Sequence, residues 1–170
     1  GDYSKAASSQ TVIAKGSSSI GDDLVDLVSA RLISVSETEA GEALAEAKIK
    51  QMTGGDVLKA RPLNGSWLEF SIIGKIFLAT NSLPQINNTD HGIWRRIQAI
   101  PFNRTFGAEE QDKDLGIKLT AELPDILNWA IQGCLEWQEQ GLNPPQVVLD
   151  QVRAYKTEMD SIAQFVEQEC

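Results

Sequence analysis

The chain has 170 residues, with 15 Lys and Arg, 24 Asp and Glu, and a net charge of −9. This length suits one domain with a hydrophobic core. No stretch approaches the roughly 20 apolar residues that span a membrane. The two cysteines are far apart in the sequence, which argues against a disulfide framework or a zinc site and fits a reducing cytosol. The net charge argues against nucleic-acid binding by charge alone, but residues 48–104 carry eight basic and three acidic side chains, a local net charge of +5 between acidic flanks.

The hydropathy pattern predicts an α/β fold with a helical C-terminal region. Residues 1–20 are rich in Ser, Ala and Lys, which is typical of an irregular segment. Helix-forming residues or apolar residues at helical spacing predict helices over 22–30, over 39–52 and from about 112 onward. Apolar runs predict strands over 31–35, 57–63, 67–71, 75–80 and 96–102. The pair Asn64-Gly65 predicts a hairpin between the second and third of these strands.

Polar side chains follow two of the predicted strands. Glu37 and Glu39 come after the strand over 31–35, and Asn81 comes after the strand over 75–80. Open α/β sheets bind ligands at the carboxyl ends of their strands. A carboxylate there can hold Mg²⁺ or orient an attacking water, and an amide can position water against a terminal phosphate. The alternatives are an acidic helix cap after the first strand and a simple turn at Asn81.

Two adjacent arginines, Arg95 and Arg96, lie between a strand-end loop and the predicted strand over 96–102. Adjacent strand residues face opposite sides, so the two side chains are not expected to serve one site. One of them is a candidate to stabilise the phosphoryl group in a neighbouring subunit's site. The alternative is a salt bridge to Asp90 or to an acidic helix.

The predicted hairpin carries two basic residues, Lys59 and Arg61, and an aromatic residue, Trp67. Basic side chains beside an aromatic ring can contact single-stranded nucleic acid. The alternative is an exposed hairpin with solubilising charges.

In their order along the chain, several of these segments resemble the superfamily 3 primase-helicases of phages and plasmids, a superfamily that includes poxvirus-type replicative primase-helicases. The resemblance extends over about residues 30–160. It is carried by "RLISVSETE", "IKQMTGGDVLKARPL", "KIFLATNSLPQINNTDHGIWRRIQAIPF" and "LPDILNWAIQGCLEWQEQGLNPP". It implies a partial P-loop NTPase sheet of the AAA+ type with a β-hairpin over residues 1–106, and a C-terminal helical region over 107–170.

The resemblance also implies roles for individual residues. Glu37 matches the Walker B acid, which holds the metal ion, Glu39 the second acid, and Asn81 the sensor asparagine. Arg95 or Arg96 matches the arginine finger, with Arg96 preferred. The resemblance also implies that Lys50 contacts the nucleotide, and that Lys59 and Arg61 contact DNA.

The function that follows from the resemblance is an ATP- and Mg²⁺-dependent DNA helicase of phage or plasmid replication. It implies a homo-oligomer, a hexameric ring, that moves single-stranded or forked DNA in the cytosol of a bacterial host. Other replication proteins are its implied partners, and no membrane is involved.

One departure from the family is that the 170 residues contain no G-x-x-x-x-G-K-[ST] phosphate loop. We therefore expect a fragment that does not hydrolyse ATP alone. Two alternatives stay open: an ATPase-inactive oligomerisation or DNA-docking module, and an unrelated α/β protein-interaction domain.

Overall fold

The chain forms two compact units. The computed structural model describes residues 3–14, 22–36, 38–62, 64–87 and 90–160. The first unit comprises Gly1–Ile97 and Arg153–Cys170, and the second comprises Gln98–Val152. The predicted boundary between residues 106 and 107 stays a prediction. Within the described ranges, no helix is both long and apolar enough to cross a membrane.

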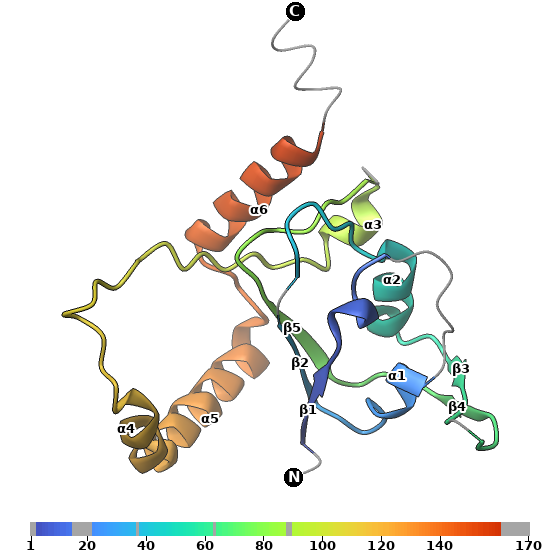
Figure 1. The fold of residues 1–170 in the computed structure, drawn as a ribbon, viewed down its shortest axis with the longest axis horizontal. Coiled ribbons are helices and arrows are strands. Elements are labelled where there is room, and N and C mark those ends of the chain that lie inside the picture. The colour runs from blue at the N-terminus through green and yellow to red at the C-terminus, as the bar shows by residue number, and fades with distance from the viewer. Residues whose placement is uncertain (1–2, 15–21, 37, 63, 88–89, 161–170) are drawn as a thin grey trace, which may run out of the picture. The chain divides into compact units, whose positions relative to one another are not determined.

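The first unit is built on a three-stranded parallel sheet (Figure 1). Its strands in spatial order are β1 (Ser4–Ala7), β2 (Leu32–Ser36) and β5 (Lys75–Ala79). The first residues of the three strands pair with one another, so the carboxyl ends of the strands lie at one edge. β1 corrects the prediction of an irregular segment over 1–20. Pairing with β2 outweighs the low strand propensity of Ser, Lys and Ala.

Alternate residues of β2 face opposite sides of the sheet. Ile33 and Val35 are fully buried, whereas Ser34 and Ser36 are exposed. The buried side faces the main core of the unit, which also contains Val12, Leu24, Leu27, Met52 and Ile93. The predicted strand over 31–35 is therefore confirmed, and its apolar residues lie mainly on one face.

Long connections join the parallel strands, as parallel pairing requires. Between β1 and β2 lie η1 (Ser9–Thr11) and α1 (Asp22–Val25). Between β2 and β5 lie α2 (Glu46–Gly54) and a hairpin of β3 (Leu58–Ala60) and β4 (Leu68–Phe70).

α2 begins later than the predicted helix over 39–52. The backbone amide of Leu44 donates to the carbonyl of Gln85 at 2.8 Å, and that of Ala45 donates to Val12 at 2.8 Å. These long-range hydrogen bonds take the place of helical ones, so tertiary pairing overrides helix propensity here. α2 ends at Gly54 and is capped by Gly55, whose φ of 81° is the left-handed conformation that glycine adopts readily.

The hairpin that Asn64-Gly65 predicts is confirmed. β3 and β4 are antiparallel, with Lys59 opposite Glu69, and residues 61–67 join them. Asn64 has a φ of 62°, a left-handed conformation that Asn tolerates better than most residues.

The prediction of a strand over 96–102 is wrong. The chain instead forms a short helix, α3 (His91–Trp94), and then runs without regular structure through Phe102. Asp90 caps α3, and the amide of Arg96 donates to the carbonyl of Ile93 at 3.0 Å, as in a helical turn. Pro101 has no amide hydrogen to donate to a strand partner.

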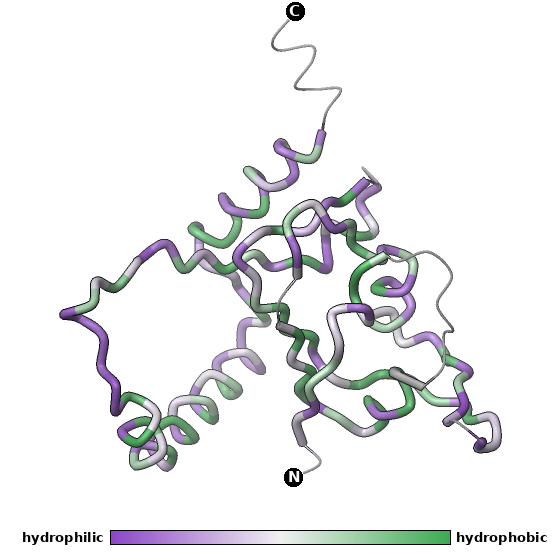
Figure 2. Tube along the Cα trace, viewed as in Figure 1, coloured by the Kyte–Doolittle hydropathy of each residue, from purple (hydrophilic) through white to green (hydrophobic). Residues whose placement is uncertain are grey.

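The predicted helices of the C-terminal region are confirmed. They are α4 (Leu115–Ala121), α5 (Leu123–Gln140) and α6 (Gln146–Met159). α4 and α5 lie in the second unit, and the residues of α6 from Arg153 onward belong to the first. Figure 2 shows apolar and polar stretches alternating along α5, the pattern of an amphipathic helix.

Candidate functional site

The carboxyl ends of β2 and β5 are joined by a pair of threonines. Ser36 and Ala79, the last residues of the two strands, pair with each other. Just beyond them, the hydroxyl oxygens of Thr38 and Thr80 lie 2.5 Å apart. Thr80 also donates to the carbonyl of Ser82 at 2.7 Å. The segments that follow β2 and β5, which the sequence predicts to form the site, are thus held side by side.

The predicted acids and amide belong to these segments. Glu37 lies outside the described residues, between Ser36 and Thr38. Glu39 is exposed, and its backbone amide donates to a carboxylate oxygen of Glu42 at 3.1 Å. Asn81 directly follows Thr80, is exposed, and makes no side-chain hydrogen bond to any described residue. Its amide is therefore available to a ligand at this edge of the sheet.

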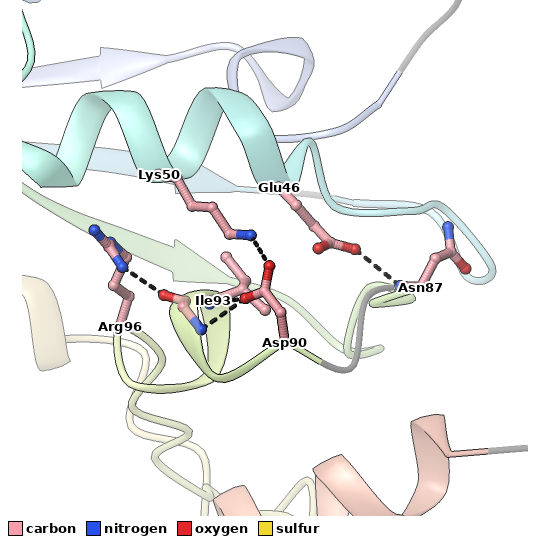
Figure 3. Close-up of polar contacts among 7 residues, drawn as sticks. Glu46, Lys50, Asn87, Asp90, Ile93 and Arg96 are labelled. Carbon is pink, nitrogen blue, oxygen red and sulfur yellow. Dashed lines mark hydrogen bonds and ion pairs between the residues drawn. The ribbon is translucent and has the colours of Figure 1, made fainter. Parts of the chain in front are cut away.

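Lys50 is engaged by the loop that precedes α3 (Figure 3). Its ammonium pairs with Asp90, whose carboxylate also accepts hydrogen bonds from the amides of Gly92 at 2.6 Å and Ile93 at 3.2 Å. The Lys50 ammonium, followed by these amides, lowers the pKa of the Asp90 carboxyl below its usual 3.8. Lys50, predicted as a nucleotide contact, thus links α2 to the cap of α3.

The side chain of Arg96 also makes contacts between α2 and α3. Its Nε donates to the hydroxyl of Thr53 at 3.1 Å, and its Nη1 donates to the carbonyl of Gly92. In a third link, the backbone amide of Asn87 donates to the carboxylate of Glu46 at 3.0 Å (Figure 3). The structure therefore brings Lys50 and Arg96 together as contacts between α2 and the α3 segment.

Arg95 has a different environment from Arg96. It is the cap residue at the end of α3, and its side chain is exposed. In the part of the chain that the structure describes, its guanidinium has no hydrogen bond and no ion pair. The two arginines do face different surroundings, although the cause is a helical turn and not the predicted strand.

The hairpin presents its charged and aromatic residues in two pairs. Lys59 forms an ion pair with Glu69 at 2.7 Å, and both side chains are more than half exposed. The guanidinium of Arg61 lies over the ring of Trp67, 5.4 Å from its centroid. Trp67 is 64% exposed. Of the two predicted DNA contacts, Lys59 has its charge balanced by an acid, whereas Arg61 is held beside an exposed ring.

Thr38 and Thr80 were missed by sequence reasoning. Their only sequence signal is their position near strand ends: Thr38 lies three residues after the predicted strand over 31–35, and Thr80 is the last residue of the predicted strand over 75–80. Among the residues that the structure describes, no three His, Cys, Asp or Glu side chains cluster as metal ligands. Glu37, the predicted metal ligand, is outside that set.

No family model matches the chain. It is 30% identical over 171 aligned residues, 88% of its length, to the protein named "Putative helicase L207/L206" of Acanthamoeba polyphaga mimivirus. It is 28% identical over 150 residues, 78% of its length, to "Putative helicase 022R" of Frog virus 3. A third relative, "Putative helicase 184R" of Invertebrate iridescent virus 6, is 33% identical over 91 residues, 47% of the chain.

The chain spans less than a fifth of each relative: 17%, 15% and 9% of their lengths. The chain is thus an α/β segment that is similar, over most of its length, to part of proteins named as helicases of large DNA viruses.

Proposed function

We propose that this chain is part of an ATP-dependent DNA helicase that acts in replication. The observation that carries the proposal is the strand-end arrangement: the Thr38–Thr80 hydrogen bond joins the segments after two parallel strands, and the exposed Asn81 side chain beside it has no hydrogen bond to a described residue. An open parallel sheet binds ligands at such an edge. The names of the three viral relatives support the same class of activity.

The residues present fit the reactive end of a nucleotide. Glu37 and Glu39 supply carboxylates after β2, and Asn81 supplies an exposed side-chain amide after β5. Bound Mg²⁺ would neutralise charge on the phosphates. In this proposal Glu37 would hold the ion or its water, and Asn81 would orient the attacking water. The phosphate loop is absent from the 170 residues, so another part of the protein must supply it.

We assign the arginine finger to Arg95 and not to Arg96. An arginine that is exposed and has no partner in its own subunit can reach a neighbouring site at least cost, and Arg95 is exposed and has no side-chain partner among the described residues. Arg96 is bound to Thr53 and Gly92, so a contact in trans would cost those hydrogen bonds. Lys50, which is bound to Asp90, is by the same reasoning a weaker candidate for a nucleotide contact. A finger that acts in trans requires an oligomer, and a hexameric ring is the proposed form.

The hairpin is the proposed DNA contact. An exposed indole with a guanidinium over it offers a stacking surface for a base and a cation for a phosphate, the pair that single-strand binding uses. In a helicase this surface would grip single-stranded or forked DNA while ATP hydrolysis moves the strand.

The replication setting is also part of the proposal. The resemblance to phage and plasmid primase-helicases would place the protein in the cytosol of a bacterial host, together with other replication proteins. The three relatives reported above come from viruses named after an amoeba, a frog and invertebrates, which widens the proposed setting to viral DNA replication in eukaryotic cells.

The test is DNA-stimulated ATP hydrolysis by the longer protein that contains this segment. Arg95→Ala is expected to lower kcat by roughly 10³–10⁵, the range for arginine fingers, while ATP still binds. Asn81→Ala is expected to lower kcat as well. Arg31→Ala is the matched control, because Arg31 is also exposed and has no side-chain partner among the described residues. Wild-type turnover that Arg95→Ala leaves unchanged would contradict the assignment.

A second candidate function is an ATPase-inactive DNA-docking module. The Arg61–Trp67 pair favours it, because that pair lies within the 170 residues and needs no phosphate loop. This function would be supported over a helicase if the longer protein bound DNA equally tightly with and without ATP and did not hydrolyse ATP.

A further inference from the structure

Tyr155 of α6 is buried against the loop that follows β5. Its side chain is 2% exposed, and its hydroxyl donates a hydrogen bond to the carbonyl of Pro84. Burial, and then the nearby Glu158 carboxylate, raise the pKa of Tyr155 above its ordinary value of 10.0. The hydroxyl therefore stays protonated and remains a donor to Pro84 at neutral pH.

The ring of Tyr155 also packs against Trp94. The two rings meet edge to face, with centroids 5.3 Å apart and planes at 80°. Trp94 is 6% exposed, and its indole N–H has no hydrogen-bond partner among the described residues. Packing, and Tyr155 in particular, therefore determines where Trp94 lies. Close by, the amide of Ile86 contacts the sulfur of Met159 at 3.5 Å.

Residues 84–87 and 90–96, here called the α3 segment, are thus held by two helices. α6 holds it through Pro84 and Trp94, and α2 holds it through the Lys50–Asp90 pair and the contact of Arg96 with Thr53. Arg95 follows Trp94 directly and lies within this fixed segment, yet its own side chain has no partner in the described part of the chain.

We infer that Tyr155 is a positioning residue for Arg95: it braces the α3 turn, which fixes the backbone position from which the exposed Arg95 side chain extends. This inference rests on the proposed role of Arg95 in the neighbouring site. A finger gains rate from fixed placement, because a displacement of about 1 Å can cost a factor of about 100.

The first measurement is backbone amide hydrogen exchange on the chain. Tyr155→Phe removes the donor and keeps the ring, so the fold should be retained. Exchange of the backbone amides of residues 85–87 and 90–96 is expected to rise about fivefold, the effect of losing one hydrogen bond, while exchange in β2 is unchanged. Tyr3→Phe is the matched control, because Tyr3 is 66% exposed. Unchanged exchange in residues 85–87 and 90–96, or an equal rise in β2, would overturn the inference.

The second measurement is ATP hydrolysis by the longer protein. Tyr155→Phe is expected to lower kcat about tenfold with little change in KM for ATP, because it displaces a group that acts only in the transition state. In an Arg95→Ala background the same change is expected to have no further effect. Equal losses in both backgrounds would show that Tyr155 acts independently of Arg95, and the inference would fall.

The two measurements separate this inference from the proposed function. If Arg95→Ala leaves hydrolysis unchanged, the arginine-finger assignment fails. The exchange experiment still decides whether Tyr155 fixes the segment that carries Arg95.

Discussion

The hydroxyl oxygens of Thr38 and Thr80 lie 2.5 Å apart and connect the segments that follow β2 and β5. The two residues are 42 positions apart in the sequence, and both are partly buried. The Thr80 hydroxyl oxygen also accepts from the amide of Ser82 at 3.2 Å and donates to its carbonyl, so it shapes the turn that contains Asn81. The proposed acid segment and the proposed sensor are therefore coupled through side chains as well as through the sheet.

Thr80→Val is expected to lower the free energy of unfolding by about 1–3 kcal/mol, because it keeps the shape but leaves the Thr38 hydroxyl and the Ser82 amide without this partner. Urea denaturation measures the change. Thr80→Ser, which keeps the hydroxyl, is expected to lose less. Thr105→Val is the control, because Thr105 is exposed. A Thr80→Val midpoint equal to that of the control would show that the hydroxyl pair does not stabilise the fold.

Arg96→Ala and Arg95→Ala are expected to differ in stability. Arg96→Ala removes the hydrogen bonds to Thr53 and Gly92, each worth about 1 kcal/mol, so the midpoint of thermal unfolding should fall. Arg95→Ala should leave it unchanged, because that side chain is exposed and has no partner within the described ranges. Differential scanning calorimetry on both variants gives the comparison. A loss for Arg95→Ala as large as that for Arg96→Ala would mean that Arg95 also has a structural contact.

The contact between Asp90 and Lys50 predicts a dependence of stability on acid pH. The pKa of Asp90 is lowered in the folded chain, chiefly by Lys50, so its contribution is present above the usual 3.8 and is lost as pH falls below that value. Asp90→Asn should therefore lower the midpoint temperature of thermal unfolding at pH 7. At low pH the midpoint of the variant should approach that of the wild type.

Asp26→Asn serves as the control for this titration, because Asp26 is exposed. Thermal unfolding from pH 7 down to pH 3 shows whether the two curves converge. A constant gap between wild type and Asp90→Asn across that range would show that the charged form of Asp90 contributes no extra stability.

The elements that the sequence predicts well are those with strong local signals. The strand over 31–35 and the strand over 75–80 are apolar runs, and the hairpin has Asn64-Gly65 between its strands. Each of these signals is local, and the fold agrees with it.

The wrong predictions are those in which distant contacts outweigh a local pattern. Ser4–Ala7 has little strand propensity and becomes a strand because β2 offers it a partner. Residues 96–102 have a strand-like pattern, but the Asp90 cap makes a helical turn just before them and leaves them without a partner strand.

The candidate site was predictable only in outline. The position of Asn81 follows from the end of a strand. The contacts that distinguish Arg95 from Arg96 do not, because they depend on Thr53 and on the docking of α2 against α3. Tyr155 reaches Pro84 across 71 positions in the sequence. No local pattern encodes a hydrogen bond over that separation.

The hairpin predicts two opposite effects on DNA affinity. Trp67→Ala removes the exposed ring beside Arg61 and is expected to weaken binding of single-stranded DNA by about 1–3 kcal/mol, the value of one stacked base. Glu69→Gln removes the acid that pairs with Lys59, so that lysine becomes free for a phosphate and binding should tighten.

Fluorescence anisotropy with a labelled oligonucleotide measures both effects, and repeating it over a salt series separates them. Glu69→Gln should steepen the salt dependence, by about 0.7 in the logarithmic slope for one added phosphate contact, whereas loss of a stacked ring should leave the slope nearly unchanged. Glu109→Gln is the matched control, because Glu109 is exposed and lies outside the hairpin. If Glu69→Gln and Glu109→Gln tighten binding equally, the gain in affinity reflects net charge. That result would contradict the proposal that the hairpin is the DNA contact.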